Sequence, residues 1–193
     1  MAEHNETSAP ADNQQLKWQR SHSEKGLDLK IFNVRYDWVE NPRNGRRSRA
    51  TILETPDWVD MVPVTPEGKI VVVDQYRFGV AALTTEIPAG VIEAGEEPLA
   101  AAQRELLEET GYTSTDWVDL GWVEPNSAFQ DNHCHQWLAR GACLTHDPDL
   151  DEGEMITVRL LSLDDIRQEI TAGRIRNSLA LLALSKVFNL WNA

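Results

Sequence analysis

Residues Gly90–Tyr112 read GVIEAGEEPLAAAQRELLEETGY, a glycine-containing loop that runs into a segment rich in carboxylates. Pro98 suits the first turn of a helix, and Gly111 suits the position just after its end. Between them, one apolar stripe at helical spacing is approximated by Leu99, Ala102, Leu106 and Leu107. We therefore predict a loop followed by a helix over residues 98–110.

Three carboxylates gather on this helix. Glu105 and Glu109 are four residues apart and share one helical face, and Glu108 lies beside them. Like charges at this spacing repel and cost an isolated helix a few tenths of a kcal/mol. A divalent cation with a preference for hard oxygen ligands, such as Mg²⁺, would offset that repulsion. Arg104 can pair with a carboxylate and hold the cluster in place. The alternative is a solvated acidic face, which is the common fate of an isolated Glu pair.

The complete spacing favours a specific family. Gly90, five residues, Glu96, seven residues and then Arg104–Tyr112 (RELLEETGY) resembles the Nudix box, the signature of Nudix hydrolases. Its fixed positions are occupied by Gly90, Glu96, Arg104, Glu105, Glu108, Glu109 and Gly111. Tyr112 stands where an aliphatic residue is more usual. The resemblance implies an α+β fold, a Nudix-type α/β/α sandwich with a mixed sheet and an N-terminal antiparallel strand region.

Segments before the box narrow the resemblance to a subfamily. Gln75-Tyr76-Arg77 and Glu86-Ile87-Pro88-Ala89-Gly90 are similar to the enzymes that hydrolyse ADP-ribose and other nucleoside diphosphate sugars. Those enzymes typically carry Ser-Pro-Gly-Phe after the box, whereas this chain has Pro125-Asn126-Ser127-Ala128-Phe129. This departure widens the expected substrates to the class of ADP-ribose, ADP-glucose and GDP-mannose.

The implied reaction is Mg²⁺-dependent hydrolysis of the pyrophosphate bond, giving a nucleoside monophosphate and a sugar phosphate, with Mn²⁺ as the alternative metal. One rival is a nucleoside triphosphate pyrophosphohydrolase that cleans the nucleotide pool, and Gln75-Tyr76-Arg77 and the long N-terminal strand region argue against it. Another is a non-catalytic Nudix-like ligand-binding module. Such modules usually lose glutamates of the box, which this chain retains.

The resemblance also assigns roles to the box residues. It implies that Glu105 and Glu109 coordinate the metal, that Glu108 shares or supports this, and that the carbonyl oxygen of Ala89 is a further ligand. Arg104 would orient the glutamates.

The family needs a base that activates water, often a Glu on a loop beyond the box. Residues 149–154 (DLDEGE) form an acidic segment in the corresponding part of the chain. We expect Glu152 to be the base and Glu154 a supporting metal ligand, with the two roles open to exchange. A solvated acidic loop is the alternative.

Four residues are expected to bind substrate. Arg77 suits a phosphate or the terminal sugar because its guanidinium fork matches phosphate oxygens, and a surface salt bridge is its alternative. Glu86 is expected either to contact metal-bound substrate or ribose hydroxyls, or to pair with Arg104. Phe129 would line the sugar or base pocket, or else join the core, and Trp38 would stack on the base.

The remaining sequence predicts three regions. Residues 1–15 are polar and are expected to form a disordered tail. Residues 16–57 form an N-terminal β region for dimerisation and base clamping, and residues 58–193 form the Nudix hydrolase domain. The first region of strands includes a β-rich run over Leu29–Val39 and an Asn44-Gly45 turn, and Thr65–Gly68 marks a second hairpin. Helices are predicted near Leu163–Thr171 and Ile175–Leu190.

Composition limits the partners. The 193 residues include 18 Lys and Arg against 31 Asp and Glu, a formal net charge of −13. Such a chain is a poor non-specific binder of nucleic acid or anionic membrane. It has no apolar run of the roughly 20 residues that span a bilayer and no signal-peptide pattern at its N-terminus. Two cysteines make no disulfide framework, so we expect a cytoplasmic protein. The resemblance implies a homodimer that forms through the N-terminal strands.

Overall fold

The computed structural model describes residues 16–150, 153 and 155–191, and the chain divides into two compact units. The first unit consists of the chain up to Thr55 together with Asn126–Asp131. The second consists of Pro56–Pro125 and the chain from Asn132 onward. The predicted disordered tail, residues 1–15, lies outside the described residues.

The first unit is a three-stranded antiparallel sheet in the order β1 (Gln19–Leu29), β2 (Phe32–Glu40) and β3 (Arg47–Glu54). The run over Leu29–Val39 was expected to be continuous, but Leu29 pairs with Phe32 across a two-residue turn. The pattern could not show this break, because both sides of it are β-rich. The turn between β2 and β3 contains Gly45 at φ 68°, as the Asn-Gly dipeptide predicts.

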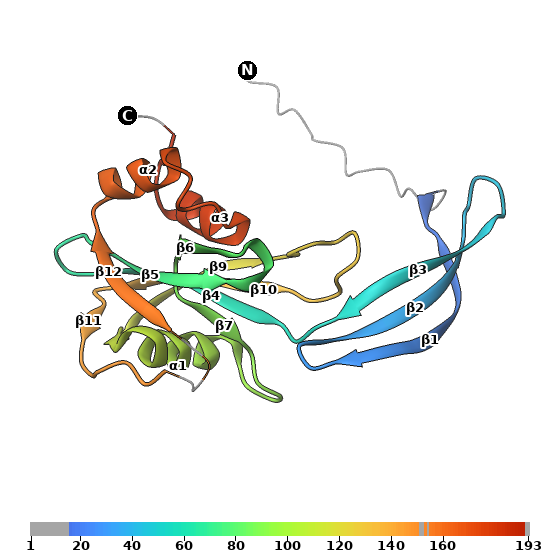
Figure 1. Cartoon of the computed structure of the whole chain (residues 1–193), viewed down its shortest axis with the longest axis horizontal. Coiled ribbons are helices and arrows are strands. Elements are labelled where there is room, and N and C mark those ends of the chain that lie inside the picture. Colours follow the sequence, from blue (N-terminus) through green and yellow to red (C-terminus); the bar gives the residue numbers. More distant parts are fainter. Residues whose placement is uncertain (1–15, 151–152, 154, 192–193) are drawn as a thin grey trace, which may run out of the picture. The chain divides into compact units, whose positions relative to one another are not determined.

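The second unit is built around a seven-stranded mixed sheet (Figure 1). Its strands are β4 (Trp58–Val64), β5 (Ile70–Arg77), β6 (Ala82–Glu86), β7 (Ala89–Val91), β9 (Asp116–Val123), β10 (Cys134–Arg140) and β12 (Ile156–Leu161). The order is β12-β5-β4-β10-β9, with β6 paired to β5 and β7 paired to β4. The β4–β10 pair is parallel, whereas the other pairs are antiparallel. Two short strands, β8 (Tyr112–Thr113) and β11 (Cys143–Leu144), pair separately.

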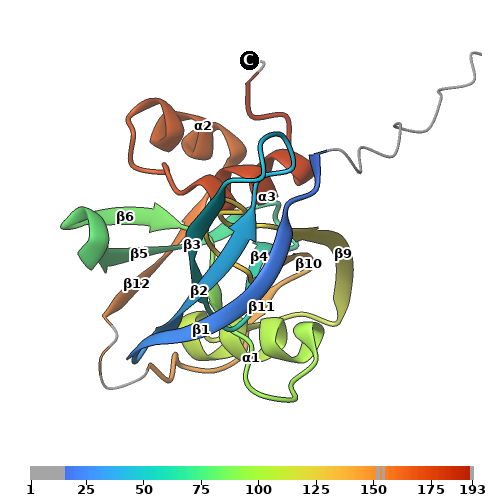
Figure 2. The ribbon, with the colours of Figure 1, turned by 90° about the vertical axis from the view of Figure 1, so that its right-hand side faces the viewer.

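Helices cover both faces of this sheet, as Figures 1 and 2 show. α1 (Pro98–Thr110) lies on one face, and α2 (Leu163–Thr171) and α3 (Ser178–Val187) lie on the other. A short 3-10 turn, η2 (Phe78–Val80), follows β5. The predicted α/β/α sandwich with a mixed sheet is confirmed.

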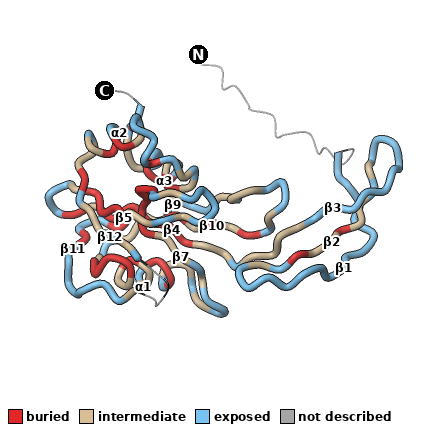
Figure 3. The backbone as a smooth tube through the Cα atoms, viewed as in Figure 1, coloured by how far each residue is buried: buried red, intermediate tan, exposed pale blue. Residues whose placement is uncertain are grey.

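The apolar side chains of β4 alternate between two cores, because successive residues of a strand point to opposite faces. Val59 and Met61 pack with α1, whereas Val62 packs with α3. Figure 3 shows the buried residues concentrated in this sheet and on the inner faces of its helices. Among the described residues, no helix is long and apolar enough to cross a membrane.

Side chains define where the last two helices begin. Ser162 and Asp165 form a reciprocal capping box at the start of α2. The helix predicted from Ile175 begins instead at Ser178. The reason is that the side chain of Asn177 accepts hydrogen bonds from the backbone N–H groups of Leu179 and Ala180.

Candidate active site

The β4–β7 pairing brings the beginning of the box beside a buried strand. Val59 pairs with Gly90, and Asp60 pairs with Ala89. The carboxylate of Glu105, reaching from α1, lies against the backbone of Gly90. A Cβ atom at position 90 would lie 1.9 Å from Cδ of Glu105. The box therefore needs glycine here because the glutamate side chain occupies the space.

Arg104 gathers the carboxylates at the start of the box and on α1. Its guanidinium donates two hydrogen bonds to Glu96, at 3.0 and 2.9 Å, and one each to Glu105 at 2.8 Å and Glu108 at 3.0 Å. A further bond at 3.0 Å reaches the carbonyl of Val91. The hydrogen bond to Glu96 raises the pKa of Arg104 above its ordinary value and lowers that of Glu96. Arg104 thus contacts two glutamates of α1 directly, and its orienting role stays a prediction.

Glu109 projects from the same helix toward β7. It is 4 % exposed, and its Oε2 accepts a hydrogen bond of 3.1 Å from the backbone N–H of Ala89. Glu105 and Glu109 therefore both meet the Ala89–Gly90 backbone, as their spacing on one helical face predicts. Glu108 is more open, with 42 % of its side chain exposed.

The donor chemistry of this cluster fits a hard divalent cation. Carboxylate and carbonyl oxygens are the ligands that Mg²⁺ prefers, and the missing Cβ of Gly90 leaves room for a carboxylate close to the backbone. Within the described part of the chain, however, no group of three or more His, Cys, Asp or Glu side chains has the geometry of a formed metal site. Arg104 holds Glu105 and Glu108, and Ala89 holds Glu109.

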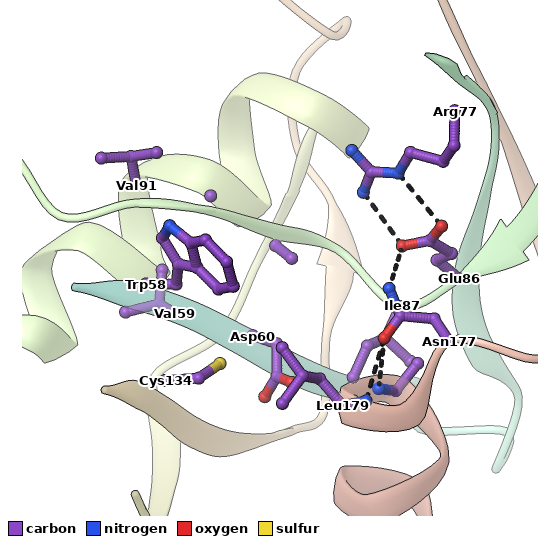
Figure 4. A pocket seen from close by; sticks show the side chains of 13 residues that line it. Trp58, Val59, Asp60, Arg77, Glu86, Ile87, Val91, Cys134, Asn177 and Leu179 are labelled. Atoms are coloured by element: carbon purple, nitrogen blue, oxygen red, sulfur yellow. Dashed lines mark hydrogen bonds and ion pairs between the residues drawn. The ribbon is translucent and has the colours of Figure 1, made fainter. Parts of the chain in front are cut away.

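A cavity of about 300 Å³ lies beside the Ala89–Gly90 backbone (Figure 4). Apolar groups contribute much of its wall, including the side chains of Trp58, Ile87 and Leu179. Polar side chains reach it from five elements or their ends: Asp60, Arg77, Glu86, Cys134 and Asn177. The cavity can thus accommodate an organic group next to the glutamate cluster.

Arg77 and Glu86 form a two-pronged ion pair at one end of this cavity. Nε and Nη2 of Arg77 donate to the two carboxylate oxygens of Glu86, at 3.0 and 2.9 Å. Thr84 and Asn177 also donate to Glu86, at 2.6 and 3.0 Å. Burial would raise the pKa of Glu86, but these donors outweigh it and hold the pKa below its usual range. The sequence left open that Glu86 pairs with Arg104, but its partner is Arg77, while Arg104 is bonded to the carboxylates of the box. Contact of Glu86 with substrate stays a prediction.

Asp60 is a cavity residue that sequence reasoning missed. It is 2 % exposed, and burial raises its pKa to about 7, whereas Gln136, Cys134 and Lys186 act in the opposite direction. The available signal was one charged residue within the otherwise apolar run of β4. Asn177 was missed as well, because a helix-capping residue gives no indication in sequence of the pocket beside it.

Four more residues were predicted to belong to the site, namely Glu152, Glu154, Trp38 and Phe129. Glu152 and Glu154 lie outside the described residues. Trp38 and Phe129 belong to the first unit. The indole N–H of Trp38 donates to Glu24 at 2.9 Å, and the side chain of Phe129 is exposed.

Comparisons with known proteins relate this chain to a family. The NUDIX domain model matches residues 55–182. An ADP-ribose pyrophosphatase of Bacillus subtilis is 38 % identical over 137 residues, which are 70 % of this chain and 74 % of that protein. A methanol dehydrogenase activator of Bacillus methanolicus is 36 % identical over 156 residues, covering 80 % and 84 %. A crystal structure of an ADP compounds hydrolase has a TM-score of 0.77 at 20 % identity, covering 89 % of this chain and 92 % of that one, and is similar in fold.

The contact at Gly90 generates a testable prediction. In Gly90→Ala, the new methyl group displaces the flexible carboxylate of Glu105, so we expect enzymatic activity to fall at least tenfold while the melting temperature changes little. Gly79→Ala is the matched control, since its Cβ would meet nothing within 4 Å. Steady-state kinetics and thermal denaturation of both variants check this, and full activity of Gly90→Ala would contradict it.

Proposed function

The chain belongs to the Nudix family, and from this premise we propose that it hydrolyses the pyrophosphate bond of nucleoside diphosphate sugars. The products would be a nucleoside monophosphate and a sugar phosphate. Nudix enzymes use a divalent metal ion, and we propose Mg²⁺, with Mn²⁺ as a substitute. The substrate class we propose comprises ADP-ribose, ADP-glucose and GDP-mannose.

One observation carries this proposal: the glutamates of α1 and the cavity meet at the same stretch of backbone. Glu105 and Glu109 contact Gly90 and Ala89, and these two residues also line the cavity. A diphosphate beside the glutamates could therefore extend one of its two organic ends into the cavity. The similarity to an ADP-ribose pyrophosphatase supports the same assignment.

The reaction needs charge neutralisation and a positioned water. When bound, the metal ion would supply positive charge at the diphosphate, held by Glu105, Glu109, Glu108 and the Ala89 carbonyl. Arg104 would keep two of these carboxylates in place through the contacts described above.

The attacking water forms a new oxygen–phosphorus bond as the bridging oxygen–phosphorus bond breaks. Its proton passes to a base, for which we propose Glu152, with Glu154 as a further ligand or as the base in its place. The half-exposed guanidinium of Arg77 would bind a phosphate oxygen while Glu86 holds it. We further propose that Trp38 stacks on the base and that Phe129 contacts base or sugar.

A substrate panel tests the proposal directly. The enzyme and Mg²⁺ are incubated with ADP-ribose, ADP-glucose, GDP-mannose, UDP-glucose and nucleoside triphosphates, and phosphate is measured with and without added phosphatase. With a nucleotide sugar as substrate, we expect inorganic phosphate to be detected only when phosphatase is present. Pyrophosphate released from triphosphates alone would instead support the pool-cleaning reaction, and silence on every substrate would support a binding module.

Removal of one metal-binding charge should abolish most of the activity. We expect Glu109→Gln to lower kcat by several orders of magnitude with the fold intact, because the amide is nearly isosteric but a poor ligand. Glu97→Gln is a matched control, since Glu97 is exposed and makes no capping hydrogen bond at the start of α1. Full activity of Glu109→Gln would contradict the metal assignment.

We also propose that the region over residues 16–57 dimerises and helps to clamp the base, and that residues 58–193 form the hydrolase domain. The support is that large apolar side chains of this region are exposed, including Leu27, Leu29 and Ile31.

Both cysteines are free thiols, which supports a reducing cytoplasm as the location.

The proposed dimer can be tested by the molecular mass of the protein in solution. Wild-type protein should elute at twice the mass of one chain, whereas Leu27→Asp combined with Ile31→Asp should give a monomer because charged groups would be buried at the interface. Leu83→Asp, a substitution at an exposed leucine of β6, should leave the mass unchanged. Size-exclusion chromatography with light scattering checks this, and an unchanged mass for the double variant would contradict it.

A further inference from the structure

A buried carboxyl group lies in the cavity without a role in the reaction proposed above. In Figure 4, Asp60 lies between Cys134 and Leu179, with Trp58 above it. Gln136, itself fully buried, donates from Nε2 to Oδ2 of Asp60 at 3.0 Å. Oδ1 of Asp60 has no hydrogen-bond partner within the described part of the chain.

This arrangement is costly unless a ligand completes it. A buried polar atom without a partner destabilises the folded chain, and more so if the group is charged. Gln136 also donates to the carbonyl of Leu179 at 3.2 Å, so its amide is fixed between β4 and α3. Gln136 therefore fixes the orientation of Asp60, and besides this amide the carboxylate interacts with the Cys134 thiol, which is a weak donor.

The surroundings define which ligand group would fit. A second anion, such as a phosphate, would be repelled by the carboxylate, and Arg77 at the other end of the cavity is paired with Glu86. The thiol of Cys134 beside Asp60 is a weak donor. The apolar walls favour an uncharged group, so the complement of Oδ1 is a neutral hydrogen-bond donor on a compact organic moiety.

We propose that Asp60 is a specificity-determining residue that accepts, through Oδ1, a hydrogen bond from a hydroxyl group of the substrate's sugar. This inference rests on the proposed function. The box glutamates Glu105 and Glu109 meet the Ala89–Gly90 backbone, which lines the cavity, so the moiety inside the cavity is an end of the diphosphate. A sugar offers neutral hydroxyl donors there, and a hydroxyl also accepts hydrogen bonds.

The test compares variants across substrates that lack single hydroxyls. We expect wild-type kcat/KM to fall about tenfold or more when one particular hydroxyl is removed from the terminal ribose of ADP-ribose. Asp60→Ala should lose a similar factor on ADP-ribose itself and should no longer distinguish it from that deoxy analogue. The kcat/KM of Asp60→Asn should lie between those of wild type and Asp60→Ala, because the amide can still form a hydrogen bond with the hydroxyl. Asp116→Ala, a matched substitution at an exposed residue of β9, should behave as wild type.

Several outcomes would overturn this inference. One is that Asp60→Ala distinguishes the deoxy sugars as strongly as wild type does. Another is that its defect disappears with hypoxanthine in place of adenine, which would assign Asp60 to the amino group of the base. If Asp60→Ala does not fold, the wild-type measurements decide. An unchanged wild-type kcat/KM after removal of each hydroxyl in turn overturns the inference. A wild-type enzyme that hydrolyses no nucleotide sugar refutes the proposed function instead, and this inference falls with it.

Discussion

The constraint on which the site depends is the repulsion among the carboxylates of α1 and the loop before it. Arg104 meets this constraint with four hydrogen bonds to Glu96, Glu105 and Glu108. Guanidinium forks suit such shared recognition because their donors are rigid and planar. The helix can therefore carry closely spaced glutamates in a folded chain and keep them available to a cation.

The sheet positions this charged helix relative to the cavity. β7 pairs with β4, so the box begins beside the strand that contributes Trp58 and Asp60 to the cavity. The alternation of β4 sends Val59 and Met61 to the core under α1 and Asp60 to the opposite face. One short strand pair thus links the proposed hydrolytic groups to the proposed sugar pocket.

The two carboxylates of the cavity, Asp60 and Glu86, differ in how many hydrogen bonds they accept. Glu86 receives hydrogen bonds from Arg77, Thr84 and Asn177, which stabilise its charge. Asp60 accepts a hydrogen bond from Gln136, and its pKa is raised because burial outweighs the effects of Gln136, Cys134 and Lys186. A satisfied carboxylate holds its neighbours, whereas an unsatisfied one is available to a ligand.

The sequence alone determined the family, the α/β/α sandwich, the helix of the box and the two hairpin turns, because each depends on local spacing or on backbone geometry at a glycine. It also identified Glu105 and Glu109 as neighbours, since a helix of known period places them on one face. Tertiary structure decided the rest. The pairing of Glu86 with Arg77, the burial of Asp60 by Gln136, and the contribution of Asn177 join residues from different elements. Such contacts depend on strand register and helix docking, which the local pattern of side chains does not encode.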